Sequence, residues 1–301
     1  MRAKLTAAAC AGLLLAASAA FAQPPKGQGV EELTVRTADG WTLPITYYRS
    51  GGGKETPAVI LVHGKGGNRQ VWKGLAGRLH GAGYALVAVD LRKHGDSQPP
   101  ANAGPRAERL TPADYQKMAT LDLEAVKDFL LERHQAEELN VRKTAIVAAD
   151  DMAPVAVNWA LADWLKKPYP DAPTLAAQTP RGQDVRAIVL LSPSEGAGGL
   201  NLGRALPQLR NDLFKVAAWI AVGAEDREDK GTAEKSYERL TAGGGTAKER
   251  VFLDVFNRVK ARGTELLTVR NADIAGRVED FLNRHLKPLD DKWRSRKSRL
   301  Q

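Results

Sequence analysis

Cysteine is almost absent from this chain. Its 301 residues include one Cys, Cys10, beside 28 Gly and 16 Pro. A single thiol excludes an intrachain disulfide framework and a thiolate metal cage. The Gly and Pro residues follow no period and no internal repeat is visible, so collagen-like, low-complexity and solenoid architectures are excluded as well.

Long apolar runs are also missing. After residue 22 no stretch reaches the roughly 18 apolar residues of a membrane-spanning helix, so we expect no membrane span. A hydrophobic fraction of 43% with 26% charged residues is typical of a globular protein. We interpret residues 23–286 as one domain, because no composition shift divides them.

The first residues resemble an export signal. Residues 1–22 begin with two basic residues, continue with a stretch rich in Ala and Leu, and end in Ala20-Phe21-Ala22. This order matches a cleavable signal peptide with a small-x-small cleavage site, so the mature chain is expected to begin at Gln23. We therefore predict an exported protein, either periplasmic or secreted, that loses its only Cys on cleavage.

Positive charge is concentrated at the other end. The whole chain carries a formal net charge of +9, and the basic C-terminal tail, residues 287–301, has six Lys or Arg against two Asp. Two interpretations stay open, a solvated frayed end or contact with an anionic surface such as lipid headgroups or wall polymer. No recognition motif accompanies the charge, so a nucleic-acid partner is not expected.

Hydrophobic patterning indicates an α/β fold. Residues 31–49 alternate polar and apolar positions around Asp39-Gly40, which predicts a hairpin. Short apolar runs then alternate with amphipathic stretches. The predicted strands are 58–64, 85–90, 144–150, 187–193, 216–223 and 250–256, and the predicted helices lie near 69–80, 112–135, 153–165, 232–241 and 271–286. Continuous apolar strands separated by helices predict a mostly parallel sheet covered on both faces.

Two segments of the first half carry a family resemblance. The segments are ILVHGKGGNRQVW at 60–72 and GYALVAVDLRKHGDS at 83–97. Together they resemble the first half of an α/β-hydrolase fold protein of the esterase and dienelactone-hydrolase kind. The downstream strand order agrees, so the resemblance covers roughly residues 30–286. It implies a mostly parallel central sheet with helices on both faces and an N-terminal antiparallel hairpin.

The same resemblance implies a nucleophile on a tight strand-to-helix turn, usually a Ser within GxSxG. By position that turn is 149–153, where Asp151 stands in place of Ser and Ala in place of both glycines. The adjacent Asp150 leaves a register ambiguity of one residue. We favour Asp151, because Met152 and Ala153 then fall at the last two positions of the motif.

The family's catalytic base, a His after the last strand, is missing. None of the five His lies in the 257–265 loop, where Arg262-Gly263 occupies the expected place. Arginine stays protonated at ordinary pH and is not a general base. Asp226 keeps the position of the family's acid. We interpret His63 and His94 as structural, and Ser194, after a different strand, as not the nucleophile.

These positions suggest a fixed charge cluster of Asp151, Arg262 and Asp226 in place of Ser, His and Asp. An Arg between two carboxylates can satisfy both by paired hydrogen bonds. The resemblance assigns the oxyanion-hole N–H groups to Lys65 and Met152. If Arg262 points outward instead, the carboxylates form an acidic pocket for a cation. We expect no metal, because no Asp-x-Asp-x-Asp-Gly loop is present and Arg262 competes, and no cofactor.

Two classes of function follow. The first is a non-catalytic hydrolase homologue, a pseudoenzyme, that binds a small-molecule ligand or protein partner at the former active site. The alternative is an active hydrolase of carboxylic ester or related bonds with Asp151 as nucleophile, as the resemblance to haloalkane dehalogenases and epoxide hydrolases implies. The arrangement in space decides between them. A His near Asp151 or Asp226 favours the enzyme, and Arg262 between the carboxylates favours the pseudoenzyme.

Overall fold

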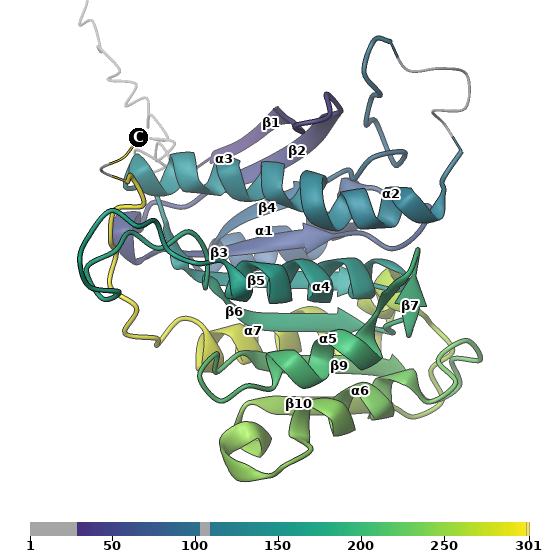
Figure 1. The fold of residues 1–301 in the computed structure, drawn as a ribbon. Coiled ribbons are helices and arrows are strands. Elements are labelled where there is room, and N and C mark those ends of the chain that lie inside the picture. Colours follow the sequence, from purple (N-terminus) through teal and green to yellow (C-terminus); the bar gives the residue numbers. More distant parts are fainter. Residues whose placement is uncertain (1–28, 103–108, 299, 301) are drawn as a thin grey trace, which may run out of the picture.

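The computed structural model describes residues 29–102, 109–298 and 300. The predicted export signal, residues 1–22, lies outside these ranges, as does Cys10. An eight-stranded sheet in the order β1-β2-β4-β3-β5-β6-β9-β10 forms the centre of the molecule (Figure 1). β2 runs antiparallel to both of its neighbours, β1 and β4, and every other pair is parallel. The predicted fold class is confirmed.

The strands lie close to the apolar runs that predicted them. They are β1 (Gly29–Arg36), β2 (Thr42–Arg49), β3 (Pro57–Val62), β4 (Ala85–Val89), β5 (Asn140–Ala149), β6 (Val185–Leu191), β9 (Ala217–Gly223) and β10 (Val251–Phe256). β3, β4 and β9 are buried along their whole length. Such strands read as unbroken apolar runs, because both faces of the sheet are covered.

Helices cover both faces of the sheet (Figure 1). They are α1 (Lys73–Gly81), α2 (Pro112–Lys117), α3 (Leu123–Gln135), α4 (Met152–Leu165), α5 (Leu202–Leu209), α6 (Thr232–Thr241) and α7 (Ile274–His285). The apolar sides of α3 to α6 pack in one core cluster, whereas α1 and α7 pack in the other. The described helices therefore divide between the two faces, as the resemblance implies.

The long helix predicted over 112–135 is continuous but changes its winding. A π-helical turn, Met118–Asp122, joins α2 to α3. The helix begins with a capping box, in which the Thr111 hydroxyl and backbone N–H donate to Asp114 Oδ2 at 2.6 and 2.7 Å. The wider turn places the buried Asp122 against Arg92, whose Nε donates to it at 2.9 Å. The Arg of the DLRKHGDS stretch is thus structural.

Two elements escaped the sequence pattern. A two-stranded hairpin, β7 (Gly196–Ala197) with β8 (Leu200–Asn201), follows β6 and leads into α5. The turn between the two strands is Gly198-Gly199, and both glycines have positive φ angles. Strands of two residues are too short to show periodicity, which is why the pattern of apolar residues did not reveal them.

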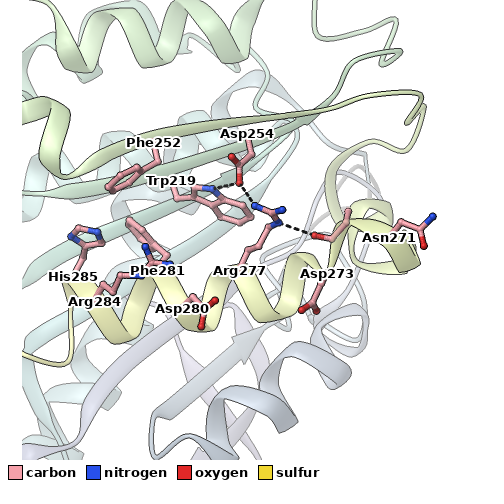
Figure 2. A pocket seen from close by; sticks show the side chains of 11 residues that line it. Trp219, Phe252, Asp254, Asn271, Asp273, Arg277, Asp280, Phe281, Arg284 and His285 are labelled. Atoms are coloured by element: carbon pink, nitrogen blue, oxygen red, sulfur yellow. Dashed lines mark hydrogen bonds and ion pairs between the residues drawn. The ribbon is translucent and has the colours of Figure 1, made fainter.

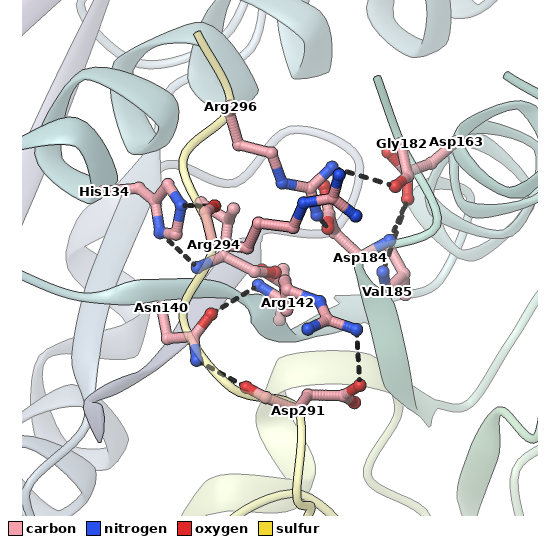
Figure 3. Close-up of polar contacts among 12 residues, drawn as sticks. His134, Asn140, Arg142, Asp163, Gly182, Asp184, Val185, Asp291, Arg294 and Arg296 are labelled. Atoms are coloured by element: carbon pink, nitrogen blue, oxygen red, sulfur yellow. Dashed lines mark hydrogen bonds and ion pairs between the residues drawn. The ribbon is translucent and has the colours of Figure 1, made fainter. Parts of the chain in front are cut away.

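The basic C-terminal tail is not a frayed end. Its residues 291–298 pack across the amino ends of the strands (Figure 3). Trp293 stacks on His134 with ring centroids 4.8 Å apart, and the backbone oxygen of Arg294 accepts from His134 Nε2 at 2.8 Å. Arg294 donates to three backbone carbonyls of the connection between α4 and β6. The solvated-end interpretation is wrong for this described part of the tail.

Arg296 of the tail completes a buried ionic group, which we call the amino-end cluster. The group consists of Lys127, Asp163, Asp184 and Arg296. Lys127 Nζ lies 2.7 Å from a carboxylate oxygen of each Asp, and the Arg296 guanidinium contacts Asp184 (Figure 3). No side chain of the four is more than 4% exposed. The tail therefore supplies a counter-charge to the protein interior, and Arg296 is not free to contact an anionic surface.

Candidate functional site

The turn between β5 and α4 is the sharp strand-to-helix turn that the resemblance implies. Asp150 follows the last residue of β5 and has a φ of 51°, in the left-handed region that few non-glycine residues adopt. Asp151 has a φ of −65° and is the N-cap of α4. The strained position therefore belongs to Asp150, one residue before the Asp151 that the motif register favours.

The Asp150 carboxylate points into a narrow space between two loops. A Cβ atom at either Gly64 or Gly263 would overlap its Oδ2 atom. Gly64 follows β3 and Gly263 follows β10, so the strand ends that meet here are those the sequence identified. Glycine is needed at both positions because the carboxylate fills the room of a side chain.

Arg262 lies between two carboxylates. Its Nε is 2.9 Å from Asp150 Oδ1, and its Nη1 donates to Asp226 Oδ2 at 2.8 Å. The Asp150 contact is an ion pair without good hydrogen-bond alignment, because Asp150 Oδ1 has no hydrogen-bond partner in the described residues. The expected contact of Arg262 with Asp226 is present, whereas the expected direct contact with Asp151 is replaced by one with Asp150.

Asp151 joins the group through Ser194. The Ser194 hydroxyl donates to Asp151 Oδ1 at 2.8 Å and accepts from Arg262 Nη2 at 3.0 Å. Ser194, which follows β6 and is not expected to be the nucleophile, is a bridge between Asp151 and Arg262. We call the group of Asp150, Asp151, Asp226, Arg262 and Ser194 the carboxyl-end cluster. A sequence pattern could not find this bridge, because Ser194 comes from a different strand end.

The electrostatics of the cluster are unbalanced. Burial raises the pKa of Asp150 to about 6, an effect that Arg262 opposes and that Asp151 and Asp226 reinforce. One guanidinium therefore faces two nearby carboxylates, and Arg262 itself is 18% exposed. Burial of the Asp150 carboxyl is thus the main cause of its raised pKa, and the neighbouring carboxylates add to it.

The five His all lie within the described residues, and their contacts are elsewhere. His63 contacts Gly64 and Leu91, His80 contacts Arg49, His94 contacts Arg92, His134 contacts Leu139 and Arg294, and His285 packs against Phe252 and Phe281. Burial lowers the pKa of His63 to about 4, so its ring is neutral and its Nε2 accepts from the Leu91 N–H. These contacts fix loop geometry, and none joins a carboxylate of the cluster.

The two residues expected at the oxyanion hole lie beside the cluster. Lys65 follows β3, and its exposed side chain brings Nζ to 3.9 Å from Asp151 Oδ2. Met152 is the first residue of α4 and is buried. In the family pattern, the residue after the strained position supplies the N–H donor. Because Asp150 holds that position, the donor here would be Asp151 and not Met152.

A cavity of about 470 Å³ opens against Arg262. We call it the Arg262 cavity. Its lining comes from the β6–β7 loop, the β9–α6 loop, α6 and the loop after β10. The lining residues are Ser194, Glu195, Glu228, Lys230, Thr232, Lys235, Arg239 and Arg262. The cavity gives a dissolved molecule access to Arg262.

A second hollow lies away from the cluster, between β10 and α7 (Figure 2). The Trp219 indole N–H donates to Asp254 Oδ2 at 3.1 Å, and Arg277 pairs with the same oxygen at 3.1 Å. Phe252, Phe281 and His285 form its apolar wall. None of the sequence-predicted site residues lines this hollow.

Metal and membrane features were sought in the same ranges of the chain. The described residues contain no group of three or more His, Cys, Asp or Glu that could hold a metal ion. At the cluster, Arg262 occupies the space between Asp150 and Asp226 that a cation would need. Among the helices of the described residues, none has both the length and the apolar character required to cross a bilayer.

Comparison with known proteins supports the topology. A family model described as alpha/beta hydrolase fold matches residues 57–141. A search of curated proteins returns no significant match.

Solved structures resemble the chain over most of its length. An esterase of Pyrococcus furiosus is 19% identical with a TM-score of 0.59, and the alignment covers 86% of this chain and 92% of the esterase. A dienelactone hydrolase of Anabaena variabilis is 17% identical with a TM-score of 0.58, covering 86% and 99%. An esterase of Exiguobacterium antarcticum is 15% identical with a TM-score of 0.53, covering 84% and 100%. Identities this low establish the fold alone, and with the observed sheet order they show that the chain has the α/β-hydrolase fold.

Proposed function

We propose that this protein is an exported, non-catalytic member of the α/β-hydrolase fold that binds a ligand or partner at the former active site. The observation that carries the proposal is the position of Arg262. It lies where the family has its base, and it pairs with both Asp150 and Asp226. A guanidinium holds its protons at any ordinary pH, so it accepts none from a nucleophile or from water.

The expected loss of rate is large. A missing general base costs about 10²–10⁴-fold, and losing a member of a catalytic triad costs about 10⁴–10⁶-fold. Backbone donors near Lys65 and Asp151 could still stabilise an oxyanion, because they do not depend on side-chain identity. Such donors alone give only a small rate enhancement, so the retained frame fits binding better than turnover.

Turnover of short-chain aryl esters tests the proposal. We expect purified wild-type protein to hydrolyse them no faster than buffer, and the Asp150→Ala and Asp151→Ala variants to behave identically. Wild-type turnover well above buffer that disappears in one of the two variants would overturn the non-catalytic assignment. The variant that loses activity would also show which of the adjacent carboxylates is the nucleophile.

A restoration experiment sharpens the test. The double variant Asp150→Ser with Arg262→His places a hydroxyl and an imidazole at the two altered positions and keeps Asp226. We expect this variant to exceed wild type in aryl-ester turnover, with each single variant as its control. Gain of activity only in the double variant would support the view that chemistry, and not the frame, was lost.

The alternative, an active hydrolase with a carboxylate nucleophile, has one observation in its favour. The strained turn presents a carboxylate, Asp150, where the family presents its Ser. A covalent ester intermediate there would still need a base to activate water for its release. The nearest side chains, Arg262 and Ser194, do not supply one, so we place this function second.

Export is the part of the proposal that rests on residues 1–22. Fractionation of a bacterial host that expresses the full chain tests it. We expect the protein outside the cytoplasm with an N-terminus at Gln23, and Edman sequencing or mass spectrometry reads that N-terminus directly. An uncleaved chain retained in the cytoplasm would contradict export.

A further inference from the structure

The lining of the Arg262 cavity carries more cations than carboxylates. Four basic side chains face two acidic ones, Glu195 and Glu228. Arg239 is neutralised by Glu195, with Nη1 2.8 Å from Oε2. Lys230 and Lys235 are exposed and make no ion pair with any described residue. These two lysines are therefore unpaired, whereas Arg262 is already paired with Asp150 and Asp226.

The unpaired lysines stand at the positive end of a helix. Lys230 lies two residues before α6, and Lys235 is the fourth residue of that ten-residue helix. The backbone N–H groups at a helix N-terminus create a positive potential that favours anions and disfavours cations. The Asp229 carboxylate already accepts from the Gly231 and Ala233 N–H groups at this end. A bound anion would therefore pair with the two lysines and not with the helix N-terminus.

Arg262 has donors to spare at the wall of the same cavity. A guanidinium carries five N–H groups. Its Nε faces Asp150, one N–H of Nη1 binds Asp226, and one N–H of Nη2 binds Ser194. One N–H on each terminal nitrogen is left over, and these two nitrogens are the pair that binds a carboxylate or phosphate in a bidentate manner.

We propose that the Arg262 cavity binds a small organic anion through its carboxylate or phosphate group. The oxyanion contacts the free N–H groups of Arg262, and Lys230 and Lys235 supply the neutralising charge. Asp150 and Asp226 compete with the anion because they already pair with Arg262. Glu228 competes as well, because its exposed carboxylate lies 3.7 Å from Arg262 Nε. The inference rests on the proposed function, in that it names the ligand class of the same non-catalytic site.

Calorimetric titration at low ionic strength tests this assignment, with sodium phosphate and sodium benzoate as separate probes. The Lys230→Gln/Lys235→Gln double variant should weaken binding about tenfold, and Glu228→Gln should tighten it about threefold. Lys73→Gln/Lys248→Gln removes two exposed lysines elsewhere on the surface and is the matched control. It should bind as wild type does. Preference for one probe identifies the anionic group, and similar affinity for both supports the shared chemistry.

Weaker binding in the lysine variant together with tighter binding in Glu228→Gln would show that the site selects for negative charge. Purely structural roles of these residues would not give opposite changes in affinity. The inference is overturned by the absence of saturable binding of both probes. Binding that the lysine variant and Glu228→Gln leave unchanged would overturn it too. The ester assay is independent of this result. Turnover by wild type would defeat the proposed function, whereas failed anion binding in an inactive protein would defeat only the ligand class.

Discussion

Two ionic clusters lie at opposite ends of the same sheet, and they differ in charge balance and burial. The amino-end cluster sets two cations against two carboxylates, with every side chain at most 4% exposed. The carboxyl-end cluster sets one guanidinium, 18% exposed, against Asp150 and Asp226 and reaches Asp151 through Ser194. Buried charges must be fully paired, whereas charges near solvent need not be. The amino-end cluster is therefore expected to contribute more to stability, and the carboxyl-end cluster is the one at which we propose a ligand.

Removing the central cation of the amino-end cluster should have the largest effect. Lys127→Met leaves Asp163 and Asp184 buried with only Arg296 as counter-charge. We expect a loss of about 3–5 kcal/mol in the free energy of unfolding, measured in urea. Lys166→Met, which breaks a partly exposed pair with Glu124, is the control and should cost below about 1 kcal/mol. Equal losses in the two variants would remove the contrast between buried and exposed pairs.

Should Lys127→Met fail to fold, a compensating change keeps the test open. Lys127→Met with Asp184→Asn removes a cation and a carboxylate together. Because buried charge pairs can often be replaced without net loss, this double variant should recover soluble protein. If the double variant gives no more soluble protein than Lys127→Met, the lysine matters for packing and not for charge.

The next effect concerns the tail. Arg296→Gln leaves Asp184 with Lys127 alone and should lower the free energy of unfolding by about 2–3 kcal/mol. The adjacent Lys297 is exposed, and its backbone N–H donates to Ser295 within the tail, so Lys297→Gln is a control that should change little. Denaturant titrations of both variants measure the difference. A tail that were merely adsorbed to the surface would give two equal and small effects.

A smaller effect is expected at the carboxyl end. Arg262→Ala leaves Asp150 and Asp226 without their shared partner and should lower stability by about 1–2 kcal/mol, less than at the amino end because solvent reaches the cluster. Thermal unfolding at pH 7 is the measurement. The melting temperature of Arg262→Lys should lie between those of wild type and Arg262→Ala. An unchanged or higher melting temperature in Arg262→Ala would argue against a stabilising salt-bridged cluster.

The smallest effect is a pH dependence at the carboxyl-end cluster. The pKa of Asp150 is raised to about 6 from an ordinary value of 3.8, so the folded state binds the proton more tightly than the unfolded state. Stability from this group therefore increases as pH falls through 6 and is lost as pH rises. Between pH 7 and pH 5 the gain is about 1 kcal/mol after allowance for partial exposure.

The matched variant for this prediction is Asp150→Asn, which has no proton to gain. The difference in unfolding free energy between wild type and Asp150→Asn should change by about 1 kcal/mol between pH 7 and pH 5. A difference that stays constant with pH, or that changes in the opposite direction, would show that Arg262 keeps Asp150 ionised and that burial does not dominate its pKa.

The sheet could be predicted from the sequence because its strands are buried on both faces and their residues form unbroken apolar runs. The hairpin around Asp39-Gly40 and the helix that begins at Thr111 carried local signals of the same kind. The meeting of the loops after these strands could also be predicted, because parallel strands bring their carboxyl ends to one edge of the sheet. That rule predicts that Asp226 and Arg262 lie close together, and they pair in the structure.

The exact register of the turn could not be predicted. Asp150 and Asp151 are chemically identical neighbours, and only the backbone path decides which one takes the left-handed conformation. The bridge made by Ser194 was also hidden, because it joins residues 43 positions apart in sequence. The packing of the tail against the domain could not be predicted either, because its basic composition resembles that of a solvated end.

The sequence by itself determined the α/β architecture, the loops that meet at the site and the presence of Arg262 in one of them. Each of these depends on local pattern or on residue identity. The tertiary structure decided which Asp faces Arg262, how Ser194 connects the two acids, and that Arg296 is buried against Asp184. Those outcomes depend on distances between residues remote in sequence. Burial also determines whether a charge must be paired, and burial is a property of the folded chain and not of its composition.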